Sequence, residues 1–132
     1  MYSGSCLCGK VTFMVRGPLA PIEICHCRQC QKAQGTPFAT NIPVHESAFV
    51  LNSGADVLKF YASSLDKKRY FCGQCGAPVY SSRDSVPGIL RIRAGLINEA
   101  IPVRPARHAY VASKCVWWEI HDDLPRSEQA WS

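Results

Sequence analysis

The chain has 132 residues, of which 47% are hydrophobic and 19% charged, and its formal net charge is +5. This length predicts a single domain over residues 1–132, and this composition excludes an intrinsically disordered protein. No apolar stretch approaches the ~18 residues needed to cross a bilayer, and no secretory signal opens the sequence, so we expect a soluble, cytoplasmic protein.

The predicted elements are mostly short strands separated by turns. In chain order, we expect strands at residues 11–15, 38–44, 57–61, 68–71, 77–80, 89–94 and 116–120. Residues 28–34 form the best helical candidate. On the strand at 89–94, the apolar residues would face inward while Arg91 and Arg93 face water. The pattern predicts a mainly β fold of small antiparallel sheets with metal-binding loops.

Cysteines carry most of the functional information in this sequence. They are Cys6, Cys8, Cys25, Cys27, Cys30, Cys72, Cys75 and Cys115. In a reducing compartment, clustered cysteines indicate metal binding rather than disulfides. If most of these thiolates hold two zinc ions, the net charge of the protein falls to about +2. The basic excess is therefore a poor argument for a nucleic-acid partner.

Two cysteine pairs have the spacing of zinc knuckles. Cys72 and Cys75 form a C-x-x-C, Cys6 and Cys8 form a C-x-C, and a glycine follows each pair. A structural zinc site needs four ligands, so the two pairs together predict one closed site. Such a site contributes on the order of 10–16 kcal/mol of metal-coupled folding free energy. Ordinary buried cysteines are the alternative explanation.

A second cluster, Cys25, Cys27 and Cys30, provides three thiols within six residues. Three protein ligands leave an open coordination position, which makes this cluster the candidate catalytic site. An incoming thiol suits such a site because it loses its proton on coordination. His26 is a candidate fourth ligand, although a residue between two ligands usually points away from the ion. We expect Cys115 to be a small buried hydrophobe.

Several segments resemble the glutathione-dependent formaldehyde-activating enzyme (Gfa) family, also called the CENP-V/GFA domain. Residues 4–11 resemble its opening G-x-C-x-C-G-x-V, residues 25–35 its C-H-C-x-x-C-x-K/R-x-x-G, and residues 69–76 its R-x-F-C-x-x-C-G. Residues 94–97 and 108–125 are similar to the later parts of the family pattern. These segments occur in the family's order along the whole chain.

The resemblance implies a β-tent fold, similar to the Mss4-like architecture. It also implies two zinc ions per chain: a structural one held by Cys6, Cys8, Cys72 and Cys75, and an open one held by Cys25, Cys27 and Cys30. The implied activity is that of a carbon–sulfur lyase, in which the open zinc binds the sulfur of glutathione and promotes its condensation with formaldehyde to S-(hydroxymethyl)glutathione.

The expected partners are therefore a small thiol and an aldehyde, without membrane or nucleic acid, and a homo-oligomer is left open. Cations for the two carboxylates of glutathione are available at Arg28, Lys32, Arg69, Arg91 and Arg93, although a solvated strand face explains the last two better. One alternative function is a non-catalytic zinc module that binds protein or nucleic acid, with residues 67–71 as the basic and aromatic run. Another is a thiol or metal sensor at the three-cysteine cluster.

Overall fold

The computed structural model describes residues 1–131, which form ten strands in two sheets. The small sheet has the order β1-β2-β5, with bounds Tyr2–Ser5, Thr12–Val15 and Phe49–Ser53. The large sheet has the order β10-β3-β4-β9-β8-β7-β6, with bounds Pro105–Ala109, Ile22–Cys25, Ala39–His45, Val86–Arg93, Pro78–Arg83, Lys67–Cys72 and Leu58–Ala62. The protein is 43% strand and 12% helix, which confirms the mainly β prediction.

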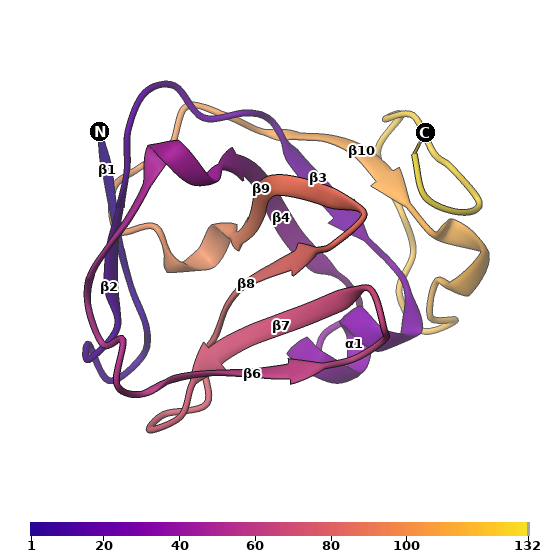
Figure 1. The fold of residues 1–132 in the computed structure, drawn as a ribbon. Helices are drawn as coiled ribbons and strands as arrows, with labels where there is room; N and C mark the ends of the chain where they lie inside the picture. Colours follow the sequence, from indigo (N-terminus) through magenta and orange to yellow (C-terminus); the bar gives the residue numbers. More distant parts are fainter. Residues whose placement is uncertain (132) are drawn as a thin grey trace.

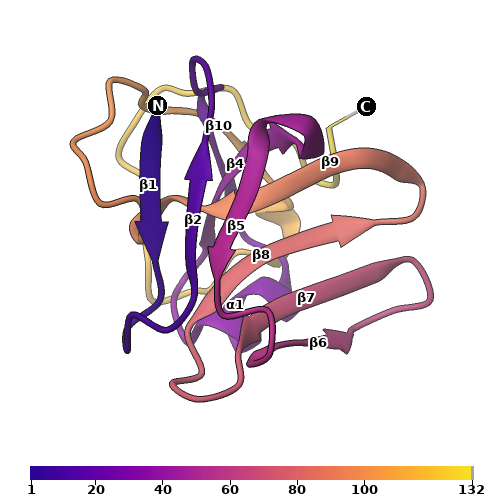
Figure 2. The ribbon, with the colours of Figure 1, turned by 60° about the vertical axis from the view of Figure 1, so that its left-hand side comes forward.

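Figures 1 and 2 show the small sheet at one end of the molecule, with the strands of the large sheet running away from it. Neighbouring strands are antiparallel except for β10, which pairs with β3 in parallel. The short helical elements are α1, η1, η2 and η3, with bounds Arg28–Gln34, Glu46–Ala48, Ala94–Leu96 and Val111–Ser113. Over residues 1–131, no helix has the length and apolar character to cross a membrane.

The hydrophobic core lies between the two sheets. Val11, Phe13 and Val15 are at most 1% exposed, as the alternation of residues 11–15 predicts. They pack with Ile42 on β4, Ile92 on β9 and neighbouring apolar side chains of the large sheet. One face of the large sheet therefore packs against the hydrophobic core.

The opposite face of the large sheet carries most of its charge. The strand register pairs Lys67 with Arg83 and Arg69 with Ser81 on β7 and β8. Residues in register with these pairs continue across β9, β4 and β3 to β10. Because side chains alternate between faces along a strand, these residues share one side. We call this side the cationic face, defined by Lys67, Arg69, Arg83, Arg91, Arg93 and Arg107.

The prediction that Arg93 faces water is wrong. Arg93 is only 3% exposed, although it does lie on the face opposite Ile92. The alternation assigned the two faces correctly, but α1 covers this part of the second face: Arg93 Nε donates to Gln34 Oε1 of the helix at 2.9 Å. Alternation identifies which residues share a face and does not reveal whether another element covers it.

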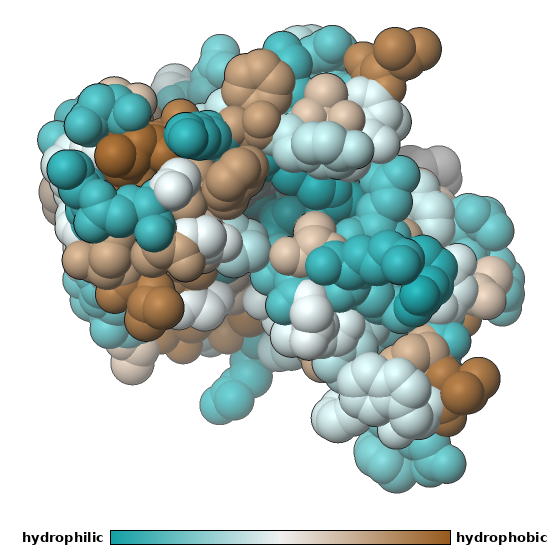
Figure 3. Space-filling model, turned by 90° about the horizontal axis from the view of Figure 1, so that it is seen from below, coloured by the Kyte–Doolittle hydropathy of each residue, from teal (hydrophilic) through white to brown (hydrophobic). Residues whose placement is uncertain are grey.

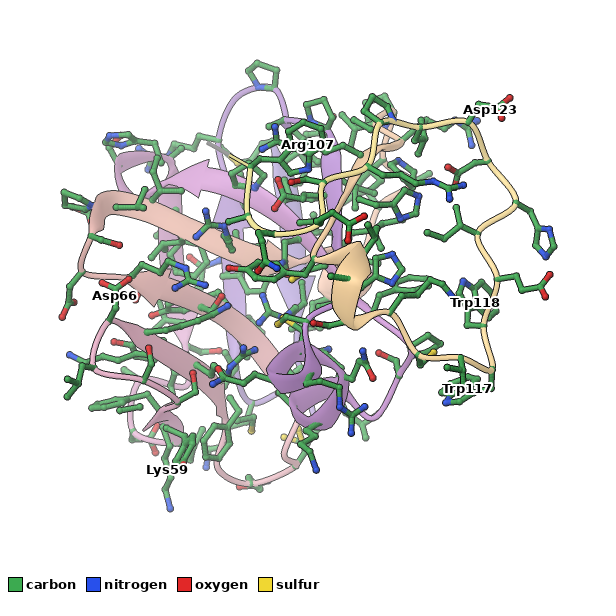
Figure 4. The ribbon with its side chains drawn as sticks, turned by 90° about the vertical axis from the view of Figure 1, so that its right-hand side faces the viewer. Lys59, Asp66, Arg107, Trp117, Trp118 and Asp123 are labelled. Carbon is green, nitrogen blue, oxygen red and sulfur yellow. The ribbon has the colours of Figure 1, made fainter. Side chains whose placement is uncertain are left out.

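The predicted strand at residues 116–120 is also wrong. This segment forms a turn and a loop, in which Val116 is 95% and Trp117 70% exposed. Figure 4 shows Trp117 and Trp118 on the loop that projects at this side of the molecule. The free edge of β10 is occupied instead by residues 125–129, whose backbone exchanges hydrogen bonds with His108 and Tyr110. Residues 116–120 therefore do not pair with the edge of β10.

Gly4 on β1 tests the packing between β1 and the core. A Cβ at this position would stand 2.1 Å from Cζ of Phe13. The Phe13 ring is fully buried and stacks on Phe49 with centroids 5.2 Å apart, so it has little room to withdraw. We expect Gly4→Ala to lower the free energy of unfolding by about 1–3 kcal/mol, because overpacking forces side chains out of their rotamers.

Urea denaturation measures this effect, with Gly95→Ala as the matched control. A Cβ at Gly95 meets nothing within 4 Å, so the control is expected to change the unfolding free energy by less than about 0.5 kcal/mol. Equal stabilities for the two variants would contradict the tight packing of Gly4 against Phe13.

Candidate metal centres

The four-cysteine cluster joins the loop after β1 to the turn between β7 and β8. Its sulfur atoms all lie within 4.8 Å of one another, and they belong to Cys6, Cys8, Cys72 and Cys75. The Sγ of Cys8 is 3.6 Å from that of Cys6 and 3.8 Å from that of Cys72, so the two sequence pairs meet in space. Four sulfur donors in this arrangement fit a tetrahedral zinc site.

Backbone N–H groups surround these sulfur atoms and favour their anionic form. The N–H of Val11 donates to Cys6 Sγ at 3.3 Å, and the N–H of Cys75 donates to Cys72 Sγ at 3.4 Å. Hydrogen bonds from the backbone of Ala77 and Cys8 lower the pKa of Cys75 to about 6. Donors of this kind orient metal-binding thiolates and stabilise their negative charge, which favours the binding of a metal cation by the cluster.

The three-cysteine cluster lies where β3 ends and α1 begins. Cys25 is the last residue of β3, Cys27 is the N-cap of α1, and Cys30 follows in the first turn of the helix. All three sulfur atoms lie within 4.8 Å of one another, and those of Cys25 and Cys30 are 3.4 Å apart. Cys27 Sγ accepts a hydrogen bond from the N–H of Cys30 at 3.2 Å. This cluster can also hold a metal ion, with three sulfur ligands.

The side chain of Arg69 links the cationic face to this cluster. Its Nη1 and Nη2 atoms lie 3.8 and 3.7 Å from the sulfur of Cys30. Hydrogen bonds with Cys25 and Cys27, and then the charges of Lys67 and Arg69, lower the pKa of Cys30 below its ordinary value, against the effect of burial. The site therefore favours thiolate at its most deeply buried sulfur.

Three cations of the cationic face are buried close to this cluster: Lys67, Arg69 and Arg93 are 5%, 8% and 3% exposed. Within residues 1–131, no carboxylate lies within ion-pair distance of any of them. Arg93 instead donates to Asn41 Oδ1 at 2.7 Å and to the carbonyl oxygen of Arg91 at 3.1 Å. Buried charge is costly without an opposite charge, and the sulfur of Cys30, which lies against Arg69, can supply one as a thiolate.

Two cavities flank the three-cysteine cluster over the cationic face. One, of about 290 Å³, contacts Cys25, and its walls include Lys67, Arg91 and Trp131. The other, of about 340 Å³, contacts Cys27. Lys67, Arg83 and Tyr110 line both cavities. Seen from below, the molecule is hollowed near its middle between hydrophilic side chains, while hydrophobic side chains gather mostly on the left (Figure 3).

The C-terminal residues cover the first of these cavities. Trp131 Nε1 donates to the carbonyl oxygen of His108 at 3.1 Å, and the guanidinium of Arg107 lies 4.7 Å from the centre of the Trp131 ring. Figure 4 labels Arg107 in the upper middle of the side that faces the viewer. Arg107 also pairs with Glu23 at 2.7 Å, so its charge is already compensated. The uncompensated charge of this cavity comes from other residues of the cationic face.

His26 does not join the cysteines. It lies on the opposite side of β3, fully buried, with Nε2 2.8 Å from Nδ1 of His108. His108 Nε2 in turn lies 3.0 Å from a carboxylate oxygen of Asp122. Since an ionised carboxylate only accepts, we infer that His108 donates to Asp122 and accepts from His26. Burial, and then the neighbouring His108, lowers the pKa of His26 to about 4, so the ring is neutral.

The hydrogen-bond chain from His26 to Asp122 ties the metal loop to the C-terminal segment. His26 also gives its backbone N–H to the carbonyl of Ala109, and its own carbonyl accepts from Gln31 Nε2 at 2.8 Å. Within residues 1–131, the Nδ1 atom of His26 has no hydrogen-bond partner. His26 therefore holds the segment with Cys25 and Cys27 in place from the side opposite the cysteine sulfurs.

The structure also separates the remaining residues singled out from the sequence. Arg28 and Lys32 lie exposed on α1, and Cys115 is buried, 8% exposed, outside both clusters. The sequence predicts neither Lys67 nor Tyr110 as a residue of this site, and it marks Lys67 only within the basic and aromatic run 67–71. Lys67 stands two residues before Arg69 on one strand, so the alternation of side chains places both on the same face. No sequence signal marks Tyr110, which adopts a left-handed backbone with φ 58°.

Comparison with known proteins agrees with this architecture. The sequence model of the family described as "Glutathione-dependent formaldehyde-activating enzyme" matches residues 1–113, which include both cysteine clusters. A crystal structure of a Rhodobacter sphaeroides protein superposes with a TM-score of 0.65, covers 79% of this chain and 99% of that chain, and is 24% identical in sequence, which shows a shared fold. A search of curated proteins found no match.

Proposed function

The chain belongs to the glutathione-dependent formaldehyde-activating enzyme family, and from this membership we propose that it is a zinc-dependent carbon–sulfur lyase. In this proposal the three-cysteine cluster binds the sulfur of glutathione and promotes its addition to formaldehyde. The observation that carries the proposal is the position of this cluster: three cysteine sulfurs within 4.8 Å of one another, between two cavities lined with cations.

We assign one zinc ion to each cluster. The four-cysteine set fills a tetrahedral coordination sphere and suits a structural ion, whereas the three-cysteine set leaves one position for a substrate. Zinc in the second set would supply a cation at which an incoming thiol loses its proton at neutral pH. Cys25, Cys27 and Cys30 are therefore the proposed catalytic ligands. A reducing compartment such as the cytoplasm would keep all these cysteines available.

The charge of the cationic face supports glutathione as the thiol. Zinc with three thiolates has a formal charge of −1, which is smaller than the combined charge of the three buried cations Lys67, Arg69 and Arg93. The face therefore keeps a positive excess, and Arg91 adds to it along the cavity wall, whereas Arg83 pairs with Asp66 at 3.5 Å. Glutathione carries two carboxylates at neutral pH, so an acidic thiol of this kind compensates the excess as it binds.

Residues 67–71 give little support to the alternative of a nucleic-acid-binding module. Lys67 and Arg69 are buried toward the cysteine cluster, while Lys68 lies over the ring of Phe60 at 5.1 Å on the other side of the sheet. The basic residues of this run therefore do not form one exposed stripe beside stacking aromatics, which single-strand binding requires.

Native mass spectrometry with and without glutathione tests the proposal. We expect two zinc ions per chain, and one glutathione adduct that forms only on chains holding the second ion. S-methylglutathione is the matched control ligand, because it keeps both carboxylates and has no free thiol. A single tightly held zinc ion with no adduct would contradict the proposed thiol site and favour the sensor or binding-module functions.

Catalysis is measured in the same preparation. Thiols add to formaldehyde without an enzyme, so the relevant quantity is the excess rate of exchange between formaldehyde and S-(hydroxymethyl)glutathione at equilibrium, followed by NMR exchange spectroscopy. The zinc-loaded protein is expected to raise this rate above that of a buffer with the same zinc concentration. Exchange at the uncatalysed rate would overturn the enzymatic function even if glutathione binds.

A further inference from the structure

Lys67 is a largely buried lysine whose side chain lies in the walls of the cavities beside the three-cysteine cluster. It begins β7, its residue is 5% exposed, and it lines both of the cavities that flank the three-cysteine cluster. Within the described chain, Nζ of Lys67 makes no hydrogen bond or ion pair. Nδ1 of His26 is the only fully buried side-chain nitrogen or oxygen without a partner among residues 1–131, so the ammonium of Lys67 is accessible from the cavity and its donors are open to a ligand there.

The other cations near the cluster are already engaged. Arg69 donates to Ser63 Oγ at 3.1 Å and lies against the sulfur of Cys30, and Arg93 is held by Asn41 and Gln34. An arginine also keeps its proton at any physiological pH. Lys67 is therefore the buried cation of this site whose donors are free and whose proton can be transferred.

We infer that Lys67 is the catalytic acid of this site, and that its ammonium donates to the aldehyde oxygen on which negative charge develops as the thiolate adds; this inference rests on the proposed function. The chemical class of its ligand is thus a small carbonyl compound, placed between the cluster and β7. A hydrogen-bond donor that is already positioned where negative charge develops lowers the activation barrier, because the donor does not have to reorganise during the reaction.

The proposed step is balanced in atoms and charge. The sulfur of the glutathione thiolate attacks the carbonyl carbon, the C–S bond forms as the C=O π bond breaks, and the electron pair moves to oxygen. Lys67 transfers one ammonium proton to this oxygen, which gives the S-hydroxymethyl product. The neutral amine regains a proton from water, and the proton that the thiol lost on binding has gone to water, so the sum is thiol plus aldehyde to adduct.

The electrostatic surroundings suit a group that must give up a proton. Burial lowers the pKa of Lys67 to about 8, with further contributions from positive neighbours, while a negative Cys30 acts in the opposite direction. General acids are most effective when their pKa lies near the working pH. The charged and titratable groups around Lys67 come from β7, β8, β9, β3, β10 and the start of α1. They are Arg69, Arg83, Arg91, Arg93, Glu23, Cys25, Cys27, Arg28, Cys30, Arg107 and Tyr110.

The test replaces Lys67 by methionine, with Lys68→Met as the matched control on the opposite face of the same strand. For Lys67→Met we expect kcat of the formaldehyde exchange to fall about 100-fold or more, the usual range for a lost general acid. Zinc content is expected to stay unchanged, and the calorimetric Kd for glutathione to rise far less than kcat falls, because Lys67 supplies only one of the positive charges of this face. Lys68→Met is expected to keep the wild-type kcat.

The separate effects of the substitution on kcat, KM and Kd distinguish a catalytic acid from the other possible roles of Lys67. A rise in KM and Kd with unchanged kcat would make Lys67 a carboxylate-binding residue and overturn the inference, and so would an unchanged exchange rate. Loss of zinc from Lys67→Met would show a structural partner of the cluster and overturn it as well. Lys67→Gln, which keeps a donor without a transferable proton, is expected to lose rate in the same way. Failure of the wild-type protein itself to accelerate exchange is a separate result, because it overturns the proposed function before any variant is compared.

Discussion

Replacing Cys72 by serine is expected to abolish the cooperative thermal unfolding transition of the protein. Cys72 is fully buried, and its sulfur is part of the only group among residues 1–131 that joins the N-terminal loop to the β7–β8 turn through metal-ligand atoms. A structural zinc site supplies about 10–16 kcal/mol of folding free energy. The total stability of a domain is about 5–15 kcal/mol, so the loss of one such ligand removes most or all of it.

The measurement is the far-UV circular dichroism of the variant during heating, together with its zinc content. Cys115→Ser is the matched control, because Cys115 is also a buried cysteine but lies outside both clusters. This control is expected to keep two zinc ions and a cooperative transition, with a loss of about 1–3 kcal/mol for the buried hydroxyl. A Cys72→Ser protein that melts like the control would show that the four-cysteine cluster does not hold the fold together.

The sequence predicts the cysteine grouping well because knuckle spacing is local information. Two pairs and one triplet of cysteines follow from positions only a few residues apart, and the structure brings together the same groups. The helix at residues 28–34 is predicted for the same reason, because Gly35, at which it ends, follows the segment directly. Local patterns of this kind need no knowledge of the rest of the fold.

What the sequence does not predict depends on elements that meet from distant parts of the chain. The burial of Arg93 requires α1 to lie over β9. The state of Lys67 requires knowing that, within the described residues, no carboxylate lies within ion-pair distance of its ammonium. The parallel pairing of β10 with β3 links residues about 80 positions apart and leaves no periodic signal in either strand. The failed strand at residues 116–120 has the same cause, because the edge it would join is taken by residues 125–129.

Replacing Cys27 by serine is expected to reduce formaldehyde exchange to the uncatalysed rate while leaving the fold intact. Cys27 is half-buried at the start of α1, and its cluster lies at the edge of the cationic face rather than between the two sheets. Serine is among the best N-cap residues, so its hydroxyl can accept the N–H of Cys30 that Cys27 Sγ accepts now. The helix therefore keeps its cap when the zinc ligand is lost.

The two cysteine variants together decide whether the clusters have different roles. With only Cys25 and Cys30 left, the second site is expected to lose its zinc ion, so that native mass spectrometry shows one ion per chain and no glutathione adduct. The melting temperature of Cys27→Ser should stay within a few degrees of wild type, since a change of about 1 kcal/mol shifts it by only about 4 °C. Equal melting losses for Cys27→Ser and Cys72→Ser would contradict the division into a structural and a reactive site. Retained exchange activity in Cys27→Ser would instead move the chemistry away from this cluster, and with it the role inferred for Lys67.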